Sequence, residues 1–335
     1  MKHVRIFLVF LLALALCSGT ALGWTPVTIT DDLGFESIIE TQPETIVSLA
    51  PTNTEIIFAL GLGDKVVGVT EYCNYPEEAL TKQTVGGYST INVEKIVTAN
   101  PDIIFANPLN GKENIDSLRQ LGYTVIVIQS DSVEGTYDAI KLIGKCTGTT
   151  AEADSIISNM KIQIQAITDK LEGVTKKPTV MHAMSVDPYW VSGSNTFQNE
   201  LITLAGGTNA FSDVEGWGVV TLEKLLTTDP EIILVDSGSK MGTTGENTLQ
   251  KAFLTEPQLS GITAVKNKAV YVMDSDTFDR GGPRIVISLE QLAQILHPEI
   301  FGEYAEPSST AASPGFGAVL IIAGLIGGLV VCRRM

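Results

Sequence analysis

Histidine is scarce in this chain of 335 residues, which contains three. His3 lies at the amino terminus, and His182 and His297 stand in neither a His-Glu-x-x-His nor a Cys-His pattern. His182 lies in an apolar stretch typical of a buried strand, which favours a hydrogen-bonded core residue over a metal ligand. Zinc hydrolysis therefore has no candidate site, and capture of a bare metal ion would need more convergent His, Asp or Glu ligands.

Motifs for nucleophilic and nucleotide chemistry are also missing. The chain has no Gly-x-Ser-x-Gly elbow, phosphate loop or Gly-x-Gly-x-x-Gly fingerprint. Basic residues are few, 22 against 38 acidic ones. Four of the basic residues lie in the terminal segments, so the region between them carries about −20, which argues against nucleic acid as a partner. The sequence predicts a protein that is not an enzyme and holds no cofactor.

Cysteine is rare as well. Cys17 and Cys332 belong to the ends of the chain, which leaves Cys73 and Cys146. Outside the cell these two could form a disulfide, but no pattern places them together, and the sequence is equally consistent with two free thiols. Their spacing matches no metal-binding pattern.

The amino-terminal end carries a targeting pattern. Residues 1–23 are typical of a secretory signal peptide, with Lys2 and Arg5 ahead of an apolar core and a small-residue cleavage site. Cys17 raises the alternative of a lipoprotein signal, although Leu16 precedes it where a small residue is preferred.

The carboxyl-terminal end consists of a Ser/Thr/Pro linker, 305–314, and an apolar segment, 315–335. Pro314-Gly315-Phe316 and the apolar run after it resemble the archaeal Pro-Gly-Phe sorting signal, which implies removal of the segment and attachment of a lipid anchor. A plain transmembrane anchor with Arg333 and Arg334 on the cytoplasmic side is the alternative. In either case we expect an exported protein anchored on the outer face of the cytoplasmic membrane.

One segment of the chain occurs twice, since residues 87–106 correspond to residues 216–235 at an offset of 129. Each copy has a glycine-aromatic pair, a short helix, a proline and a buried strand. Two copies this far apart predict two lobes of one plan with a cleft between them. The helices place one glutamate at the same point of each lobe, Glu94 and Glu223.

Strands alternate with helical stretches along the chain, and several strands are continuous Val/Ile/Leu runs. This pattern predicts an α/β fold of two doubly wound lobes with mostly parallel sheets. After an amino-terminal extension, 24–44, we expect the first lobe at 45–149 and the second at 174–304. The longest helical pattern, 150–173, lies between them with one apolar stripe. A single stiff helix as the connection predicts a small closing motion.

Aromatic residues recur in loops expected at the ends of strands. In doubly wound lobes, ligands bind outside the carboxyl ends of the strands, and aromatic side chains there suit a large ligand with a flat, partly apolar face. Asp276 and Arg280 add polar groups, or pair with each other across their loop. The aromatic candidates are Tyr72, Tyr75, Tyr88, Trp190, Trp217 and Phe278.

From about Glu44 to Gly302 the chain resembles the periplasmic cobalamin-binding proteins of ABC importers. These belong to a class with a single linking helix that also binds iron siderophores and haem. Three strings carry the resemblance: residues 48–55, shared by the wider class, and residues 67–76 and 275–284, more typical of the cobalamin branch.

The resemblance implies capture of cobalamin or a related corrinoid and delivery to a permease dimer. It implies corrin contacts for Tyr72, Asp276 and Arg280, and pocket lining by residues that match Tyr88, Trp190 and Trp217. The family often has tryptophan where this chain has Tyr88, which leaves the ligand less specified than the fold. One glutamate on each lobe docks onto the permease, a role that falls to Glu94 and Glu223. The alternative is that they pair with Lys95 and Lys224.

Three other functions remain open. The same fold could hold a ferric siderophore or haem, which would favour a more basic pocket than one with Arg280 nearly alone. A membrane-anchored surface enzyme would need a nucleophile and a base in register. The paired glutamates argue mildly against the third possibility, an adhesive or sensory ectodomain that never meets a permease.

Overall fold

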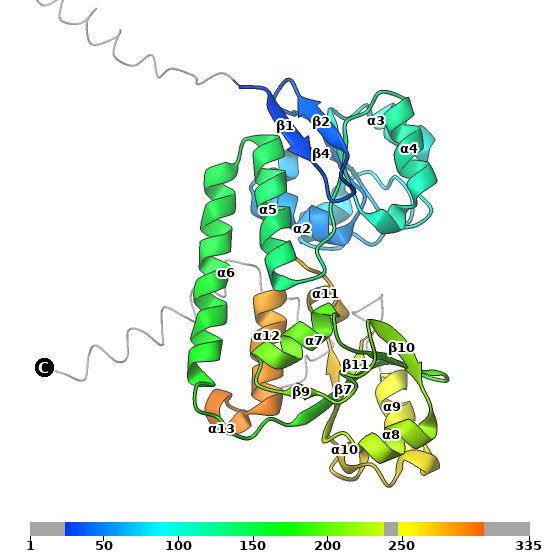
Figure 1. The fold of residues 1–335 in the computed structure, drawn as a ribbon. Coiled ribbons are helices and arrows are strands. Elements are labelled where there is room, and N and C mark those ends of the chain that lie inside the picture. Colours follow the sequence, from blue (N-terminus) through cyan, green and yellow to red (C-terminus); the bar gives the residue numbers. More distant parts are fainter. Residues whose placement is uncertain (1–23, 238–246, 305–335) are drawn as a thin grey trace, which may run out of the picture.

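The computed structural model describes residues 24–237 and 247–304. It has two α/β lobes stacked beside one long helix (Figure 1). The expected signal peptide, Ser/Thr/Pro linker and carboxyl-terminal apolar segment lie outside these ranges. Within them, no helix has both the length and the hydropathy needed to span a bilayer.

The amino-terminal lobe is built on a four-stranded parallel sheet. Its order is β4 (Val66–Val69), β3 (Ile46–Ser48), β5 (Ile103–Ala106) and β6 (Val125–Val127). Alternate residues of β5 point to opposite faces, so Ile103 and Phe105 join one apolar cluster while Ile104 and Ala106 join another. Helices α2 (Pro51–Ala59) and α5 (Val133–Thr147) cover the first face, and α3 (Val93–Ala99) and α4 (Lys112–Gln120) cover the second. The predicted doubly wound lobe is confirmed.

The carboxyl-terminal lobe contains a six-stranded sheet in which β7 (Thr179–Val186), β9 (Thr208–Asn209), β11 (Ile232–Asp236) and β12 (Val270–Met273) pair in parallel. Two antiparallel strands, β8 (Tyr189–Ser192) and β10 (Trp217–Val220), extend one edge. Only Asp187 and Pro188 separate β7 from β8, and a connection this short joins antiparallel neighbours. The helices are α7 (Phe197–Leu204), α8 (Leu222–Thr228), α9 (Thr248–Thr255), α10 (Thr263–Lys266), α11 (Ser275–Phe278), α12 (Ile285–Leu296) and α13 (Pro298–Phe301).

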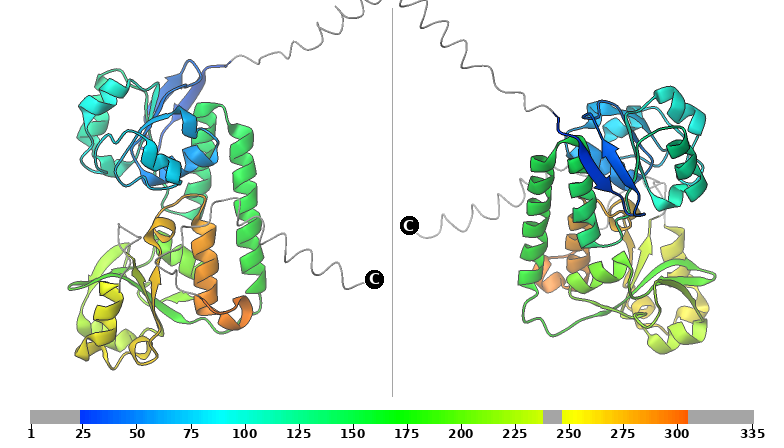
Figure 2. Two further views of the ribbon diagram at one scale, coloured as in Figure 1. Left: turned by 180° about the vertical axis from the view of Figure 1, so that it is seen from behind. Right: turned by 45° about the horizontal axis from the view of Figure 1, so that its top comes forward.

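Helix α6 (Thr150–Lys170) lies against both lobes, packing on α5 above and on α12 below. Seen from behind, both lobes lie on the same side of it (Figure 2). A single apolar cluster runs from Ile126 in one lobe through Met160 of α6 to Leu292 in the other. The predicted long helix is therefore present and shares its core with both lobes, while the small closing motion stays a prediction.

The internal repeat is confirmed down to its caps. Asn92 and Thr221 each accept a hydrogen bond from the backbone three residues on, at Lys95 and Lys224. Asn100 and Asp229 end the helices in the left-handed conformation, at φ 44° and 46°. Even the lysine side chains reach matching places, the Thr84 carbonyl and the Asp213 carboxylate. The two copies of the repeat therefore have the same local structure, including their caps and lysine contacts.

Cys73 and Cys146 are both buried and free. Cys73 lies between two threonines, and Thr54 donates a hydrogen bond to its sulfur at 3.1 Å. Burial raises the pKa of Cys146 to about 12. Of the two alternatives that the sequence left open, the structure thus has the free thiols.

The amino-terminal extension forms a hairpin that the sequence did not predict, β1 (Val27–Thr30) and β2 (Glu36–Ile39). Asp31, at its turn, accepts hydrogen bonds from its own loop and from the Val127 amide and forms an ion pair with Arg119. The Arg119 guanidinium in turn lies 3.9 Å from the centre of the Phe35 ring. One buried carboxylate thus fixes the hairpin to the edge of the sheet at β6.

Replacing Asp31 by alanine is expected to lower the free energy of unfolding by about 3–5 kcal/mol, because the change leaves the mostly buried Arg119 without its partner. Urea unfolding measures the change. As a control, Asp138→Ala removes an exposed ion pair with Lys141 and should change stability by less than about 1 kcal/mol. Equal losses in the two variants would contradict the anchoring role of Asp31.

Candidate ligand site between the lobes

Two residues far apart in the sequence form a buried ion pair between the lobes. Arg284, just before α12, donates from Nε and Nη2 to the two carboxylate oxygens of Glu55 on α2, at 2.8 and 2.7 Å. Their side chains are only 4% and 2% exposed. The Tyr75 ring centre lies 3.8 Å from the Arg284 guanidinium carbon. The sequence strings 48–55 and 275–284, which carried the family resemblance, therefore meet here.

Asp276 and Arg280 belong to the same interlobe network. They pair with each other, as the sequence allowed, and Arg280 also donates to Asn74 Oδ1 at 2.8 Å and to Glu55 at 3.2 Å. Asn74 in turn donates to Asp276 at 2.6 Å, and the Tyr72 carbonyl accepts from Arg280 at 3.4 Å. The segment expected as a loop instead contains the helical turn α11, which includes Asp276, and Arg280 follows two residues after its end.

Trp190 and Trp217 lie on the antiparallel strands β8 and β10, not in loops as expected. Trp190 stands opposite Val219, and Trp217 stands opposite Ser192. Because residues two apart on a strand share a face, these side chains occupy one side of the sheet. Trp190, Trp217 and Val219 are 42%, 39% and 55% exposed. We call these three residues the apolar platform, a surface of the kind that marks a binding site.

His182 lies beneath Trp217, with ring centres 5.6 Å apart. It is fully buried, and its ring nitrogens contact Ser192 Oγ at 3.2 Å and Asp236 Oδ1 at 3.0 Å. The predicted buried, hydrogen-bonded position of His182 is confirmed. Phe278 is also fully buried, 5.2 Å from the same ring, so it supports the site from below and presents no surface to a ligand.

The carboxylates near His182 perturb one another. Part of Asp279 is exposed, but burial of its carboxyl group and the negative charge of Asp236 raise its pKa to about 7. Burial would lower the pKa of His182, yet the charge of Asp236 and the hydrogen bond to it outweigh burial and raise that pKa. The group is therefore crowded with negative charge that the single imidazole only partly offsets.

The amino-terminal lobe contributes three tyrosines. Tyr72 is 39% exposed, whereas Tyr75 and Tyr88 are half-buried. Burial raises the pKa of Tyr88 to about 12, and the positive charge of Arg280 lowers it only in part. Asn110 holds this loop through a 2.7 Å hydrogen bond to the Tyr88 carbonyl. A neutral phenol here can donate a hydrogen bond at any ordinary pH.

Glu94 and Glu223 lie away from this network, exposed in the first turns of α3 and α8. Within the described ranges neither forms an ion pair. The neighbouring lysines point elsewhere, to Thr84 and Asp213, so the pairing of each glutamate with its own lysine is not seen.

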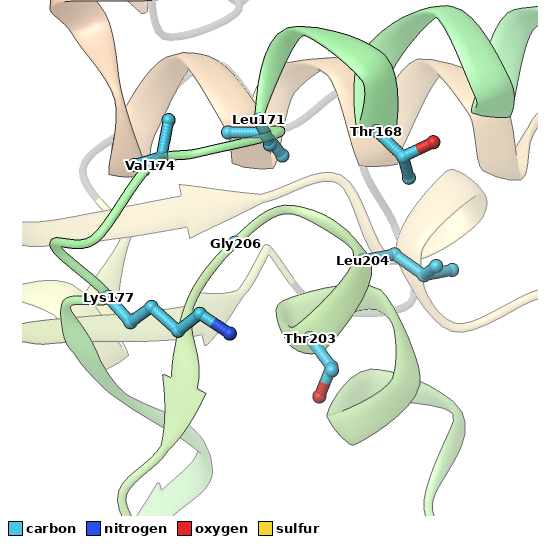
Figure 3. Close-up of a pocket in the computed structure, with 7 residues that line it drawn as sticks. All are labelled: Thr168, Leu171, Val174, Lys177, Thr203, Leu204 and Gly206. Atoms are coloured by element: carbon cyan, nitrogen blue, oxygen red, sulfur yellow. The ribbon is translucent and has the colours of Figure 1, made fainter.

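A pocket of about 200 Å³ lies at the carboxyl end of α6, remote from all these residues (Figure 3). Small-molecule sites usually measure about 300–1,000 Å³, so this pocket is too small for a large ligand. None of the predicted ligand residues lines it. Its lining consists of Thr168, Leu171, Val174, Lys177, Thr203, Leu204 and Gly206.

The structure thus joins Tyr72, Tyr75, Asp276 and Arg280 in one network and sets Trp217 and Phe278 around His182. Sequence reasoning quoted Glu55, Asn74 and Arg284 within its matching strings but gave them no role. The signal that could have identified them is a charged or amide side chain close to aromatic residues in the sequence. Sequence reasoning likewise quoted Asp279 without a role and did not mention Asp236, because the two carboxylates meet His182 only through sheet pairing and the turn after α11.

Known proteins resemble the chain over most of its length. It is 35% identical over 285 residues, 83% of this chain and 88% of the relative, to the ABC transporter substrate-binding lipoprotein YvrC of Bacillus subtilis, itself uncharacterized. It is 30% identical over 256 residues, 76% of this chain and 89% of the relative, to the vitamin B12-binding protein of Vibrio cholerae.

Two solved structures show the same architecture. The periplasmic vitamin B12 binding protein BtuF of Vibrio cholerae gives a TM-score of 0.66 at 28% identity, covering 76% of this chain and 96% of that one. The periplasmic heme-binding protein RhuT from Roseiflexus gives 0.68 at 25% identity, covering 76% and 98%. A family model described as periplasmic binding protein matches residues 46–277, and the chain belongs to the periplasmic binding protein family.

Proposed function

We propose that the chain captures cobalamin or a related corrinoid outside the cytoplasm and delivers it to an ABC importer. The apolar platform of Trp190, Trp217 and Val219 carries this proposal, because large aromatic side chains left exposed beside a polar network suit a flat ligand with a polar rim. A corrin ring has a broad face and a periphery of amide side chains. The vitamin B12-binding relatives support the same ligand class.

The polar groups fit the periphery of such a ligand. Asp276 and Arg280 hold each other and Asn74 in place, so an acceptor and a donor stand in fixed positions beside Tyr72. Amide side chains of a corrinoid offer both N–H and C=O groups to this pair. Prearranged polar groups contribute specificity with little ordering cost on binding.

Haem or a ferric siderophore is the second candidate, supported by the likeness to a heme-binding structure. Both ligands carry acidic groups that favour free cations. Arg280 and Arg284 are already engaged with Glu55 and Asp276, which leaves little unpaired positive charge for them. The neutralised arginines favour the corrinoid.

One feature resembles an enzyme site, since Ser192, His182 and Asp236 form a hydrogen-bonded chain. Ser192 and His182 are both fully buried, so no substrate reaches the serine oxygen. Nucleophilic catalysis requires an accessible nucleophile, and a relation to substrate-binding proteins supports binding without chemistry.

We further propose that Glu94 and Glu223 dock the protein onto a permease dimer and that the carboxyl-terminal end of the chain anchors it on the outer face of the cytoplasmic membrane. The two glutamates are exposed at matching places on the two lobes, which suits the two-fold symmetry of a dimeric partner. Charge-assisted contacts with arginines would set orientation and encounter rate.

Trp217→Ala should weaken corrinoid binding by about 1–3 kcal/mol, because it removes a central aromatic anchor of the platform. Calorimetry with cobalamin should show one ligand per wild-type chain. The control Ile162→Ala removes an exposed apolar side chain on α6 and should bind like wild type. No heat with cobalamin or cobinamide, together with strong binding of a ferric siderophore, would overturn the corrinoid assignment.

Changing both Glu94 and Glu223 to arginine should leave corrinoid affinity unaltered while uptake by cells falls sharply. Reversed charges would repel permease arginines, so the double variant should transport less than either single one. Calorimetry and cellular uptake of labelled cobalamin separate the two effects. A double control at exposed Glu113 and Glu152 should transport normally. A folded double variant that no longer binds corrinoid would place these glutamates in the ligand site instead.

The mature protein should begin near Trp24 and lack Arg333 and Arg334, since a sorting signal and its signal peptide are both removed. Mass spectrometry of the protein from native membranes tests both ends in one measurement. Recovery of a peptide that extends through Met335 would establish a plain transmembrane anchor in place of the processed end.

A further inference from the structure

His182, Asp236 and Asp279 converge on one small space from three separate elements. His182 lies in β7, Asp236 ends β11, and Asp279 follows α11. Each residue offers one ligand atom, and the three atoms lie within 4.8 Å of one another. We call this group the His182 cluster. None of the roles proposed above for the platform or the interlobe network uses it.

One oxygen of the cluster has no partner. Asp236 is 9% exposed, and its Oδ1 contacts the His182 ring, but its buried Oδ2 has no hydrogen-bond partner in the described part of the chain. An unsatisfied buried polar atom costs about 1–3 kcal/mol. A carboxylate oxygen beside an imidazole and a second carboxylate is best satisfied by a cation.

The orientation of His182 suits coordination. Its Nδ1 lies 3.2 Å from Ser192 Oγ, and its Nε2 points to Asp236. Histidines that bind metals commonly donate one ring N–H to a neighbouring oxygen, which fixes the ring and leaves the other nitrogen free to coordinate. An ion would replace the proton that Nε2 shares with Asp236, while Nδ1 would donate its N–H to Ser192.

Asp279 gives the cluster an open side. Gln198 donates to Asp279 Oδ1 at 2.9 Å, while the residue keeps exposed surface. An ion can therefore reach the buried ligands past a side chain that is itself a ligand. In a tetrahedral zinc site, bonds of about 2.0–2.2 Å put ligand atoms about 3.3–3.6 Å apart. The three atoms here lie within 4.8 Å of one another, so a modest shortening of their separations meets that spacing.

We infer that the His182 cluster is a binding site for a divalent transition-metal ion, of which Zn²⁺ is the best representative. One imidazole nitrogen and two carboxylate oxygens form a three-ligand set, with the fourth position left to water. The ion offsets the charge of both carboxylates and gives the unpartnered Asp236 oxygen a ligand role. Calcium and magnesium prefer sites made of oxygen alone, so the histidine selects against them.

The site lies directly under the apolar platform, since the His182 ring contacts Trp217. A bound ion would join β7, β11 and the segment after α11, and would thereby stiffen the base on which Trp217 rests. This inference rests on the geometry of the cluster and not on the identity of the transported ligand.

Zinc titration of the purified full chain, made without a histidine tag and stripped with a chelator, tests the site. Calorimetry should show one Zn²⁺ per chain, and zinc should raise the unfolding temperature, because it binds only the folded state. Tryptophan fluorescence should change at the same stoichiometry, because Trp217 lies against the His182 ring. Asp279→Ala should weaken zinc binding at least about tenfold and abolish the thermal shift, and Asp236→Asn should act in the same direction.

The matched control is Glu215→Gln, which neutralises an exposed acidic residue in the same lobe and should bind zinc like wild type. The inference is overturned if the wild-type chain binds no zinc, if both Asp279→Ala and Asp236→Asn bind zinc normally, or if Glu215→Gln loses as much. No corrinoid is present in this experiment, so its outcome is separate from that of the proposed function.

Discussion

The buried ion pair between Glu55 and Arg284 is the contact on which the site depends. Taking two charges out of water is costly, and a pair like this adds little stability over apolar packing. Removing one partner, however, would leave the other charge buried and unpaired, which is strongly destabilising. Glu55 and Arg284 therefore constrain geometry: Tyr75 stacks on the arginine, and Arg280 shares the glutamate. The positions of Asp276, Asn74 and Tyr72 follow from that arrangement.

Local sequence patterns predicted much of the fold. The capped helices of the repeat, the long helix from Thr150 and the apolar strands all depend on residues close in sequence, and all are present. The hairpin at residues 27–39 was not predicted. Asp31 fixes it through partners 88 and 96 residues away, and no short pattern contains that information.

The candidate site, like the fold, was predicted only in part from the sequence. Resemblance pointed to Tyr72, Asp276 and Arg280, and the structure places them in one network. The strand positions of Trp190 and Trp217 depend on a sheet edge formed by pairing, and the burial of Phe278 depends on packing against His182. Glu55 and Arg284 are 229 residues apart. Their meeting follows from the packing of two lobes, which spacing along the chain does not encode.

The apolar cluster that passes from one lobe through α6 into the other has a consequence for folding. Met160 and Ile167 are buried because both lobes are in place, so neither lobe completes its core alone. The protein should lose its structure in one cooperative transition despite its two lobes. Whatever binds between the lobes then protects the entire chain, including surfaces it never touches, from unfolding and proteolysis.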